Sequence, residues 1–334
     1  MTTSVKKVLV IRFSSIGDIV LTTPVVRCVK HQLPTVELHY LTKKSFGPIL
    51  QANPYIDKLW LLDESLDDLL DGLRNEDFDF IADLHGNLRS LAVKYHLETT
   101  AVTFNKLNLR KWLLVNFKIN TLPRQHIVDR YMATVKRLGV TNDGHGLDYF
   151  IPRDDMIQYE QLPLTHLHGF VAVAFGAAHK TKSIPYEKLR ELVQALNVPV
   201  VLLGGKAERE VANKIEGEFS VKVYNACGLL NVNQSASMIK MSKAVVAAET
   251  GMMHIAAAFR KPTVTVWGNT VPAFGMFPYL PGMEHRYAAM EVKVNCRPCS
   301  KLGYAKCPRG HFKCMLNHDV SRIQDLVNTV AQNR

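Results

Sequence analysis

The chain contains 334 residues, of which 47% are hydrophobic and 21% charged, and its formal net charge is +11. This length predicts two domains, and the composition is that of an ordinary globular protein. The surplus of basic residues favours an anionic partner, but the absence of any run of five basic residues argues against a nucleic-acid-binding tail.

The N-terminal segment, Met1–Phe13, contains a short apolar core, Val8–Ile11, that is closed by Arg12. It is too short for the hydrophobic region of a signal peptide, so we interpret it as a first strand. No apolar stretch approaches the roughly 18 residues that a membrane-spanning helix requires. We therefore expect a cytoplasmic protein whose six cysteines are reduced or metal-bound rather than disulfide-linked.

Short β-rich runs alternate with helical patterns along the whole chain. In the first half, strands are predicted at 7–13, 36–41, 58–62, 78–83 and 101–104, and helices at 18–31, 66–74, 88–96 and 127–138. Residues 144–163, rich in Gly, Pro and Asp, indicate a linker. In the second half, strands are predicted at 169–174, 198–203, 221–224, 244–248 and 263–267, and helices at 186–196, 206–218, 233–241, 252–259 and 320–333.

This alternation predicts an α/β fold with two Rossmann-like domains, each a doubly wound parallel sheet, facing a central cleft. The predicted N-terminal domain covers residues 1–160 and the C-terminal domain residues 161–316. We expect residues 317–334 to form a C-terminal helix that packs back on the N-terminal domain.

In the first half, polar loops follow two of the predicted strands. Ser14-Ser15-Ile16-Gly17-Asp18 lacks the three glycines of a dinucleotide fingerprint and the Gly-Lys-Ser/Thr of a phosphate-binding loop. Asp18 is either a catalytic base at the carboxyl end of a parallel strand or an acid that stabilises a helix start. Asp83-Leu84-His85-Gly86-Asn87 could bind sugar hydroxyls, although Asn87 could equally be a plain helix cap.

Two further loops, in the second half, have features of a phosphate or nucleotide site. Gly176–Ser183 combines small residues with Lys180 and Lys182, which can contact phosphate oxygens. In the loop that begins at Gly204, Glu208 could accept hydrogen bonds from ribose hydroxyls or serve the dipole of the following helix.

The stretch Ala244–Ala258 has the pattern of a strand, a tight turn and a helix start. An apolar run ends at Glu249-Thr250-Gly251, and a helix of small residues that contains His254 follows. Free backbone N–H groups and the helix dipole at such a point favour an anion. The sequence thus predicts a nucleotide diphosphate here, with Glu249 and His254 beside it.

Four cysteines cluster near the C-terminus, at positions 296, 299, 307 and 314. Cys296 and Cys299 form a Cys-x2-Cys pair, and with Cys307 and Cys314 they could hold a structural zinc ion. Because the second pair is spaced more widely than in a zinc ribbon, a loop of reduced thiols is the alternative. Cys28 and Cys227 lie in apolar surroundings and are predicted core residues.

In their order and spacing, these motifs together resemble glycosyltransferase family 9, the ADP-heptose:lipopolysaccharide heptosyltransferases. The resemblance covers essentially the whole chain. It is carried by the segments 14–24, 83–90, 181–185 and 249–258, with 266–270 continuing the last, and by the cysteine cluster.

The resemblance implies a GT-B fold, with the acceptor in the N-terminal domain and the nucleotide-sugar donor in the C-terminal domain. It also implies an inverting, metal-independent transfer without a cofactor, in which Asp18 is the general base and Lys182 holds the donor diphosphate. The residues implied to contact the donor are Ala177, Ala178, Glu208, Leu230, Glu249, Thr250, Gly251 and His254, and those implied to contact the acceptor are Ser15, Gly17, Asp83, His85 and Asn87.

The partners implied are an ADP-sugar, a lipopolysaccharide or lipid A-core acceptor and, through the basic surplus, an anionic membrane at its inner, cytoplasmic face. The chain departs from the family pattern at Glu249, where aspartate is usual, and at Asn269, where proline is usual. Two alternatives therefore stay open: a GT-B transferase or epimerase that uses a UDP- or GDP-sugar, and an inactive nucleotide-sugar-binding protein.

Overall fold

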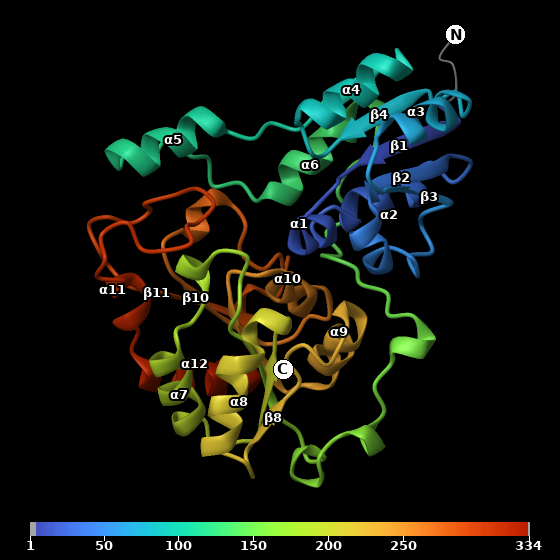
Figure 1. The fold of residues 1–334 in the computed structure, drawn as a ribbon. Coiled ribbons are helices and arrows are strands. Elements are labelled where there is room, and N and C mark those ends of the chain that lie inside the picture. Colours follow the sequence, from blue (N-terminus) through green and yellow to red (C-terminus); the bar gives the residue numbers. More distant parts are fainter. Residues whose placement is uncertain (1–4, 333–334) are drawn as a thin grey trace. The chain divides into compact units, whose positions relative to one another are not determined.

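The computed structural model describes residues 5–332, which form two compact units (Figure 1). Unit 1 comprises the chain up to Lys106 together with Gln125–Pro152, and unit 2 comprises Leu107–Arg124 together with the chain from Arg153 onward. Each unit contains one parallel sheet with helices packed on it. The predicted fold class, two doubly wound α/β domains, is confirmed.

The sheet of unit 1 has the order β3-β2-β1-β4-β5, and its paired strands are parallel. Its strands are β1 (Lys7–Ile11), β2 (Glu37–Lys43), β3 (Lys58–Leu62), β4 (Phe80–Asp83) and β5 (Ala101–Thr103). The central strand β1 pairs Val8 with Leu38 of β2 and with Phe80 of β4. Because β1 is buried on both faces, its sequence Lys-Val-Leu-Val-Ile is nearly continuously apolar.

The helices of unit 1 are α1 (Ile16–Val20), α2 (Thr23–Gln32), α3 (Asp67–Arg74), α4 (Leu88–Leu97) and α6 (Ile127–Val135). The pairs α2–α6 and α3–α4 are in contact. The sequence predicted one helix over 18–31, but the structure divides it into α1 and α2. Pro24 stands in the first turn of α2, where its missing N–H is tolerated at a helix start but would interrupt a continuous helix.

The sheet of unit 2 has the order β11-β10-β9-β6-β7-β8, again with parallel pairs. Its strands are β6 (Val171–Ala174), β7 (Val200–Leu203), β8 (Val223–Asn225), β9 (Ala244–Ala248), β10 (Thr263–Trp267) and β11 (Tyr287–Glu291). Sequence reasoning missed β11, an edge strand whose side chains are mostly half-buried or exposed. Its apolar signal is weak for that reason.

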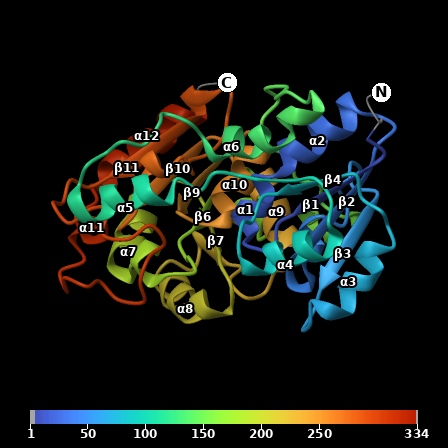
Figure 2. The same cartoon turned by 90° about the horizontal axis from the view of Figure 1, so that it is seen from above.

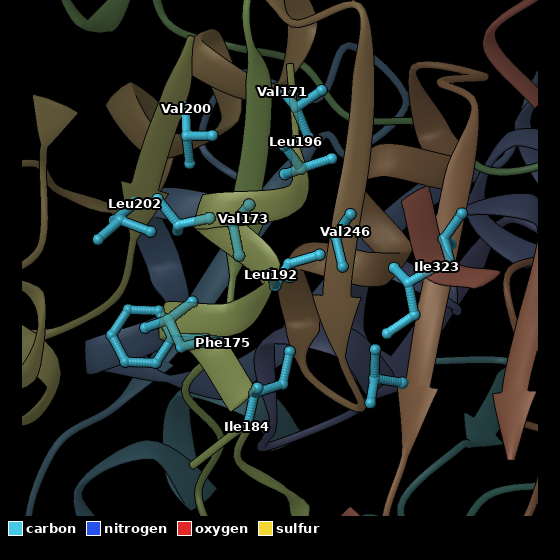
Figure 3. Close-up of a cluster of buried hydrophobic side chains, with 14 of the residues drawn as sticks. Val171, Val173, Phe175, Ile184, Leu192, Leu196, Val200, Leu202, Val246 and Ile323 are labelled. Atoms are coloured by element: carbon cyan, nitrogen blue, oxygen red, sulfur yellow. The ribbon is translucent and has the colours of Figure 1, made fainter. Parts of the chain in front are cut away.

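The helices of unit 2 are α5 (Asn108–Phe117), α7 (Tyr186–Ala195), α8 (Arg209–Glu218), α9 (Val232–Met241), α10 (Gly251–Ala258), α11 (Lys313–Leu316) and α12 (Val320–Gln332). One core cluster joins the sheet to α7, α8 and α12. Figure 3 shows part of this cluster, with Val171, Val173, Leu192, Val246 and Ile323 among the labelled side chains. In the rest of the unit, α9 and α10 pack against each other, and α10 packs on β9 and β10.

The C-terminal helix α12 belongs to unit 2 and lies in its core, whereas we expected it to pack on the N-terminal domain. Its buried residues Ile323, Val327 and Val330 recur at helical spacing and join the cluster that contains α7 and β9. The apolar stripe was visible in the sequence, but a stripe does not specify which surface it covers. Asn333, the last residue of the predicted helix, lies outside the described residues.

The domain boundaries also differ from the prediction of 1–160 and 161–316. The segment Leu107–Arg124, which contains α5, belongs to unit 2 although unit 1 surrounds it in the sequence. Lys118 anchors it there, since its Nζ donates hydrogen bonds to the backbone oxygens of Cys296 (3.1 Å) and Pro298 (2.7 Å). Among residues 5–332, no helix combines the length and the hydropathy needed to cross a membrane.

Replacing buried His318 is expected to change how unit 2 responds to acid. Its Nε2 lies 3.3 Å from Trp267 O, and burial lowers its pKa from 6.5 to about 4. Between these two values the unfolded chain binds a proton that the folded chain does not, so stability decreases as the pH falls from 6.5 toward 4. At pH 5 this loss amounts to about 2 kcal/mol for one such histidine.

Urea unfolding of His318→Gln at pH 7.5 and pH 5 measures this effect, because glutamine can still donate to Trp267 O but does not titrate. We expect the variant to lose about 2 kcal/mol less than the parent chain between the two pH values. The control, His285→Gln, changes an exposed histidine and should follow the parent. Equal pH dependence in His318→Gln and the parent would contradict the prediction.

Candidate functional site

Each sheet reverses its strand order beside a central strand, and the predicted site residues follow these strands. In unit 1, β1 is flanked by β2 and β4, and in unit 2, β6 is flanked by β7 and β9. Open parallel sheets bind ligands at the carboxyl ends of the strands on either side of such a reversal. The candidate site thus has two parts, one in each unit.

Asp18 lies in the first turn of α1, immediately after β1. Its Oδ2 accepts hydrogen bonds from Ser15 N (3.3 Å) and Ser15 Oγ (2.8 Å), and its Oδ1 lies 2.8 Å from Arg12 Nη2. The Asp18 side chain is 18% exposed. Asp18 therefore does help to cap α1, and its carboxylate is also fixed in orientation and partly open to solvent, as a general base requires.

Arg12 is a site residue that sequence reasoning used only to mark a strand end. Besides the ion pair with Asp18, its Nη1 donates to Leu84 O (2.6 Å) and Tyr131 Oη (3.1 Å). Arg12 thus ties the loop after β1 to the loop after β4. Its position in the sequence indicates such a role, because Arg12 directly follows an apolar strand. A charge buried there without a partner would be unfavourable, so an arginine at this place needs an acidic or polar partner.

Asp83, a predicted acceptor ligand, is fully buried at the end of β4. Its carboxylate accepts hydrogen bonds from the backbone of His85 (3.0 Å) and Gly86 (2.7 Å), and its Oδ2 lies 2.8 Å from Lys94 Nζ. Burial opposes ionisation, but the bonds from Lys94 and Gly86 outweigh it and lower the pKa of Asp83. With its oxygens occupied in this way, Asp83 shapes the loop and does not present a free carboxylate.

His85 and Asn87 have different surroundings in the same loop. Burial and the charges of Arg12 and Lys106 lower the pKa of His85 to about 4, so its imidazole is neutral at pH 7. Asn87 Oδ1 accepts a hydrogen bond from Ser90 N (2.9 Å). Asn87 thus caps α4, the structural role that its sequence position allowed beside ligand binding. Of the two side chains, His85 is therefore the better candidate for contact with a ligand.

In unit 2, Lys182 and Glu249 meet where the strand order reverses. Lys182 belongs to a short 3-10 turn after β6, Glu249 follows β9, and Lys182 Nζ lies 2.9 Å from Glu249 Oε1. Their side chains are only 14% and 11% exposed. A largely desolvated ammonium at the carboxyl edge of the sheet is suited to bind a diphosphate, because its interaction with charge is screened less there than in bulk water.

Thr270 and Arg297 support this pair, and sequence reasoning identified neither as a site residue. Thr270 Oγ1 donates a hydrogen bond to Glu249 Oε2, and Arg297 Nη2 donates to Thr270 O (2.7 Å). Thr270 belonged to a family motif, but only the fold brings it, 21 residues later, onto the second carboxylate oxygen. The supporting contacts fix Glu249 and, through it, Lys182.

Helix α10 begins directly beside Glu249. Thr250 is its N-cap, its side chain makes no capping hydrogen bond, and the first turn contains no acidic residue. His254 is buried one turn into the helix. The helix start thus offers its dipole and first-turn N–H groups to an anion, as the sequence pattern predicted.

The other predicted donor residues lie in neighbouring loops of unit 2. Glu208 accepts a hydrogen bond from Gly205 N (2.8 Å), and a Cβ added to Gly176 would lie 2.5 Å from Glu208 Cδ. Glycine at 176 therefore lets the loop after β6 approach Glu208 closely.

The remaining predicted donor residues also lie in loops of unit 2. Ala177 N donates to Ser183 Oγ (3.0 Å), Ala178 is exposed, and Leu230 is half-buried ahead of α9. In the described part of the chain, no hydrogen bond or ion pair connects Ala177, Ala178, Glu208 and Leu230 to one another in the way that Lys182, Glu249 and Thr270 are connected.

The zinc site considered possible at Cys296, Cys299, Cys307 and Cys314 is not supported. Among the described residues, no three of these sulfurs lie within 4.8 Å of one another. The cysteines are free thiols, and Cys296 Sγ lies 3.8 Å from His311 Nε2. The segment instead packs on the Lys182 loop, where Thr181 N donates to Tyr304 O (3.1 Å) and Tyr304 N to Thr181 Oγ1 (2.8 Å).

One group of three potential metal ligands does occur in the described chain, formed by Glu37, His39 and Glu76 of unit 1. Trp60 Nε1 donates to His39 Nδ1 (3.1 Å), which leaves the proton on Nε2 for the 2.8 Å bond to Glu37 Oε1. Hydrogen bonds from Lys58 and Lys7 lower the pKa of Glu76 to about 2. With its lone pairs and charges satisfied in this way, the group is a structural ion network.

Comparison with known proteins identifies the family. The profile of glycosyltransferase family 9 (heptosyltransferase) matches residues 68–306. A lipopolysaccharide heptosyltransferase 1 from Campylobacter coli is 24% identical over 292 residues, which cover 79% of this chain and 84% of that protein. The described structure is also similar to solved structures, and the similarity extends over both units.

Two of these structures illustrate the likeness. A glycosyl transferase family 9 protein from Veillonella parvula superposes with a TM-score of 0.77 and 19% identity, covering 100% of this chain and 99% of that one. An ADP-heptose lps heptosyltransferase II from E. coli gives a TM-score of 0.73 and 19% identity, covering 98% and 99%. Because both structures are only 19% identical to this chain, they establish its fold alone, and that fold is GT-B, as predicted.

Proposed function

The chain belongs to glycosyltransferase family 9, and from this membership we propose that it transfers a heptose from an ADP-sugar to the core of a lipopolysaccharide. The name of the Campylobacter relative supports the acceptor class, and the name of the E. coli structure supports the donor. Both names describe those two proteins. The proposal for this chain therefore depends on whether its own residues can bind an ADP-sugar and catalyse the transfer.

The observation that carries the proposal is the Lys182–Glu249 pair beside the start of α10. In a donor complex, Lys182 and the first-turn N–H groups would bind the diphosphate oxygens, and Glu249 would accept hydrogen bonds from the sugar. Glu208 is proposed for the ribose hydroxyls, with Ala177, Ala178 and Leu230 in contact with the nucleotide. The donor residues all belong to unit 2, which we therefore propose as the donor domain.

The reaction would be a single displacement that inverts the anomeric carbon. Asp18 accepts the proton of an acceptor hydroxyl as its oxygen forms a bond to that carbon, and the bond from the carbon to the diphosphate breaks, which releases ADP. The charge that develops on the leaving diphosphate is stabilised by Lys182 and the dipole of α10. These groups provide what a divalent cation would otherwise supply, so we propose a transfer that needs no metal and no cofactor.

The acceptor would be bound by unit 1, through the loops that carry Asp18 and His85. Ser15 donates to Asp18 in the first of these loops, with Gly17 between them in the sequence, while Asp83 and Asn87 hold the second loop in place. A lipopolysaccharide core is attached to a lipid, so we propose that the enzyme works at the inner, cytoplasmic face of the membrane, in peripheral contact with its anionic surface.

A second candidate function follows from Glu249. Its side chain is one methylene longer than the aspartate that is usual in the family, and a carboxylate with a different reach would suit a different donor sugar. A UDP- or GDP-sugar transferase, an epimerase, or an inactive nucleotide-sugar-binding protein would each retain the anion site. Two measurements distinguish these functions: whether the protein transfers a sugar to an acceptor, and which nucleotide it binds best.

The test measures both properties on the purified full chain. We expect ADP to raise the melting temperature more than UDP or GDP does, and ADP-heptose to be consumed with heptose added to a heptose-deficient lipopolysaccharide core, detected by mass spectrometry. Added chelator should leave the rate unchanged. A larger shift with UDP or GDP would overturn the ADP donor, and donor binding without transfer or hydrolysis would identify an inactive binding protein.

A further inference from the structure

Helix α5 and the short segment that follows it present apolar side chains to solvent instead of burying them. Leu109, Trp112, Phe117 and Ile119, here called the α5 apolar surface, are 70%, 51%, 58% and 54% exposed. The rings of Trp112 and Phe117 lie edge to face with centroids 5.3 Å apart, so the two aromatic residues form one patch. A surface helix of a globular domain usually has the opposite arrangement, with its apolar stripe toward the core.

The opposite side of α5 is fixed to unit 2. Leu114 is buried, Val115 lines a cavity of about 800 Å³ together with residues of the cysteine-rich segment, and Lys118 is bonded to Cys296 O and Pro298 O. Figure 2 shows α5 beside this part of unit 2. The apolar surface is therefore held in place by the fold, and it does not result from a frayed segment.

The charged residues that flank this surface in the sequence are all basic. The sequence contains no Asp or Glu from Thr99 to Val128, whereas Lys106, Arg110, Lys111, Lys118 and Arg124 all fall within that stretch. Arg110 and Arg124 are exposed, and Lys301 of the cysteine-rich segment reaches Asn108 Oδ1 at the start of α5 (3.4 Å). Such a combination complements an anionic partner that also accepts apolar groups.

We propose that the α5 apolar surface and its flanking cations bind an anionic phospholipid bilayer, with the helix lying in the headgroup region. Trp and Phe favour the boundary between headgroups and acyl chains, and cations near an anionic leaflet add electrostatic attraction. An acidic protein partner would offer negative charge to the cations. It would not by itself provide an apolar environment for the exposed leucine, isoleucine and two aromatic rings of the α5 apolar surface. The inference rests on the proposed function only in that a lipid-linked acceptor gives the binding a purpose.

Vesicle sedimentation with the full chain tests the proposal. We expect binding to vesicles of phosphatidylglycerol and phosphatidylcholine at 3:7, much weaker binding to pure phosphatidylcholine, and a decrease of roughly tenfold or more in the partition coefficient of Trp112→Ser/Phe117→Ser. The matched control, Leu164→Ser/Val221→Ser, removes two apolar residues of the same unit that are even more exposed, at 82% and 75%, and should bind like the parent. Brominated lipid should quench tryptophan fluorescence in the parent and less in Trp112→Phe.

Several outcomes would overturn the proposal. These are absence of binding by the parent, equal binding of the α5 variant and the parent, or a concentration-dependent dimer in sedimentation velocity that the α5 variant abolishes, which would make a second copy the occupant. ADP affinity and transfer to a soluble, deacylated core are measured in parallel. If ADP affinity and transfer persist while vesicle binding fails, this inference and the proposed membrane contact fall, but the proposed transfer reaction stands. If ADP affinity and transfer fail while vesicle binding persists, the proposed transfer falls and this inference stands.

Discussion

Replacing Asp18 with asparagine is expected to reduce heptosyl transfer by about a thousandfold, within the range that a general base contributes. The amide keeps the shape of the side chain and can still accept a hydrogen bond from Arg12 Nη2, but it cannot take a proton from the acceptor hydroxyl. Initial rates with ADP-heptose and a lipopolysaccharide core, measured by release of ADP, give the effect. The affinity for ADP, measured by calorimetry, should stay unchanged because the proposed donor residues all belong to the other unit.

The control for this variant is Asp68→Asn, which makes the same chemical change at an exposed position of α3 in the same unit. It should retain the rate of the parent. Loss of the Asp18 charge also leaves the buried guanidinium of Arg12 without its ion pair, so the melting temperature of Asp18→Asn must be compared with the parent. A well-folded Asp18→Asn protein with near-normal turnover would exclude Asp18 as the base.

Replacing Lys182 with methionine is expected to weaken ADP binding by about 10- to 100-fold. Hydrogen bonds to charged groups contribute roughly 1.5–3 kcal/mol, and 1.4 kcal/mol corresponds to a factor of ten in affinity. The variant also leaves the carboxylate of Glu249, only 11% exposed, without its cation and beside the incoming diphosphate. Isothermal calorimetry with ADP measures the loss, and Lys293→Met, at an exposed site of the same unit, is the control.

A double variant separates the two causes of this loss. In Lys182→Met/Glu249→Gln the repelling carboxylate is gone, so we expect ADP affinity between that of the parent and that of the single variant, with an interaction energy that a double-mutant cycle reports. Unchanged affinity in Lys182→Met would contradict the donor role of the lysine. Strictly additive effects of the two changes would contradict coupling through the 2.9 Å contact.

Most of the fold was predictable because parallel strands buried on both faces are continuously apolar. Strands such as β1, β6 and β9 stand out in the sequence for that reason. The edge strand β11 was missed because it has little apolar signal, and α5 was missed because its exposed apolar residues do not form the inward stripe of an ordinary surface helix. The division of the first predicted helix at Pro24 was visible in the sequence but not used.

The candidate site was predictable to the level of loops, since each polar loop follows a strand that the pattern located. Asp18, Lys182 and Glu249 were all identified in this way, and the structure brings Lys182 and Glu249 into contact. Their supporting residues, Arg12 and Thr270, were not identified as site residues. Asp83 was predicted as a ligand, but whether a carboxylate at a strand end is buried or open depends on which neighbours saturate it.

The sequence by itself thus determined the two parallel sheets, the strand ends that carry the polar loops and the membership of a transferase family, because burial periodicity and short motifs are local properties of the chain. The tertiary structure decided what depends on contacts between distant residues. It joined Glu249 to both Lys182 and Thr270, placed α12 in the core of unit 2, and fixed α5 to that unit through Lys118, 178 residues from Cys296 in the sequence. An apolar stripe or an unpaired charge shows that a partner is needed, and only the packed fold shows which one it meets.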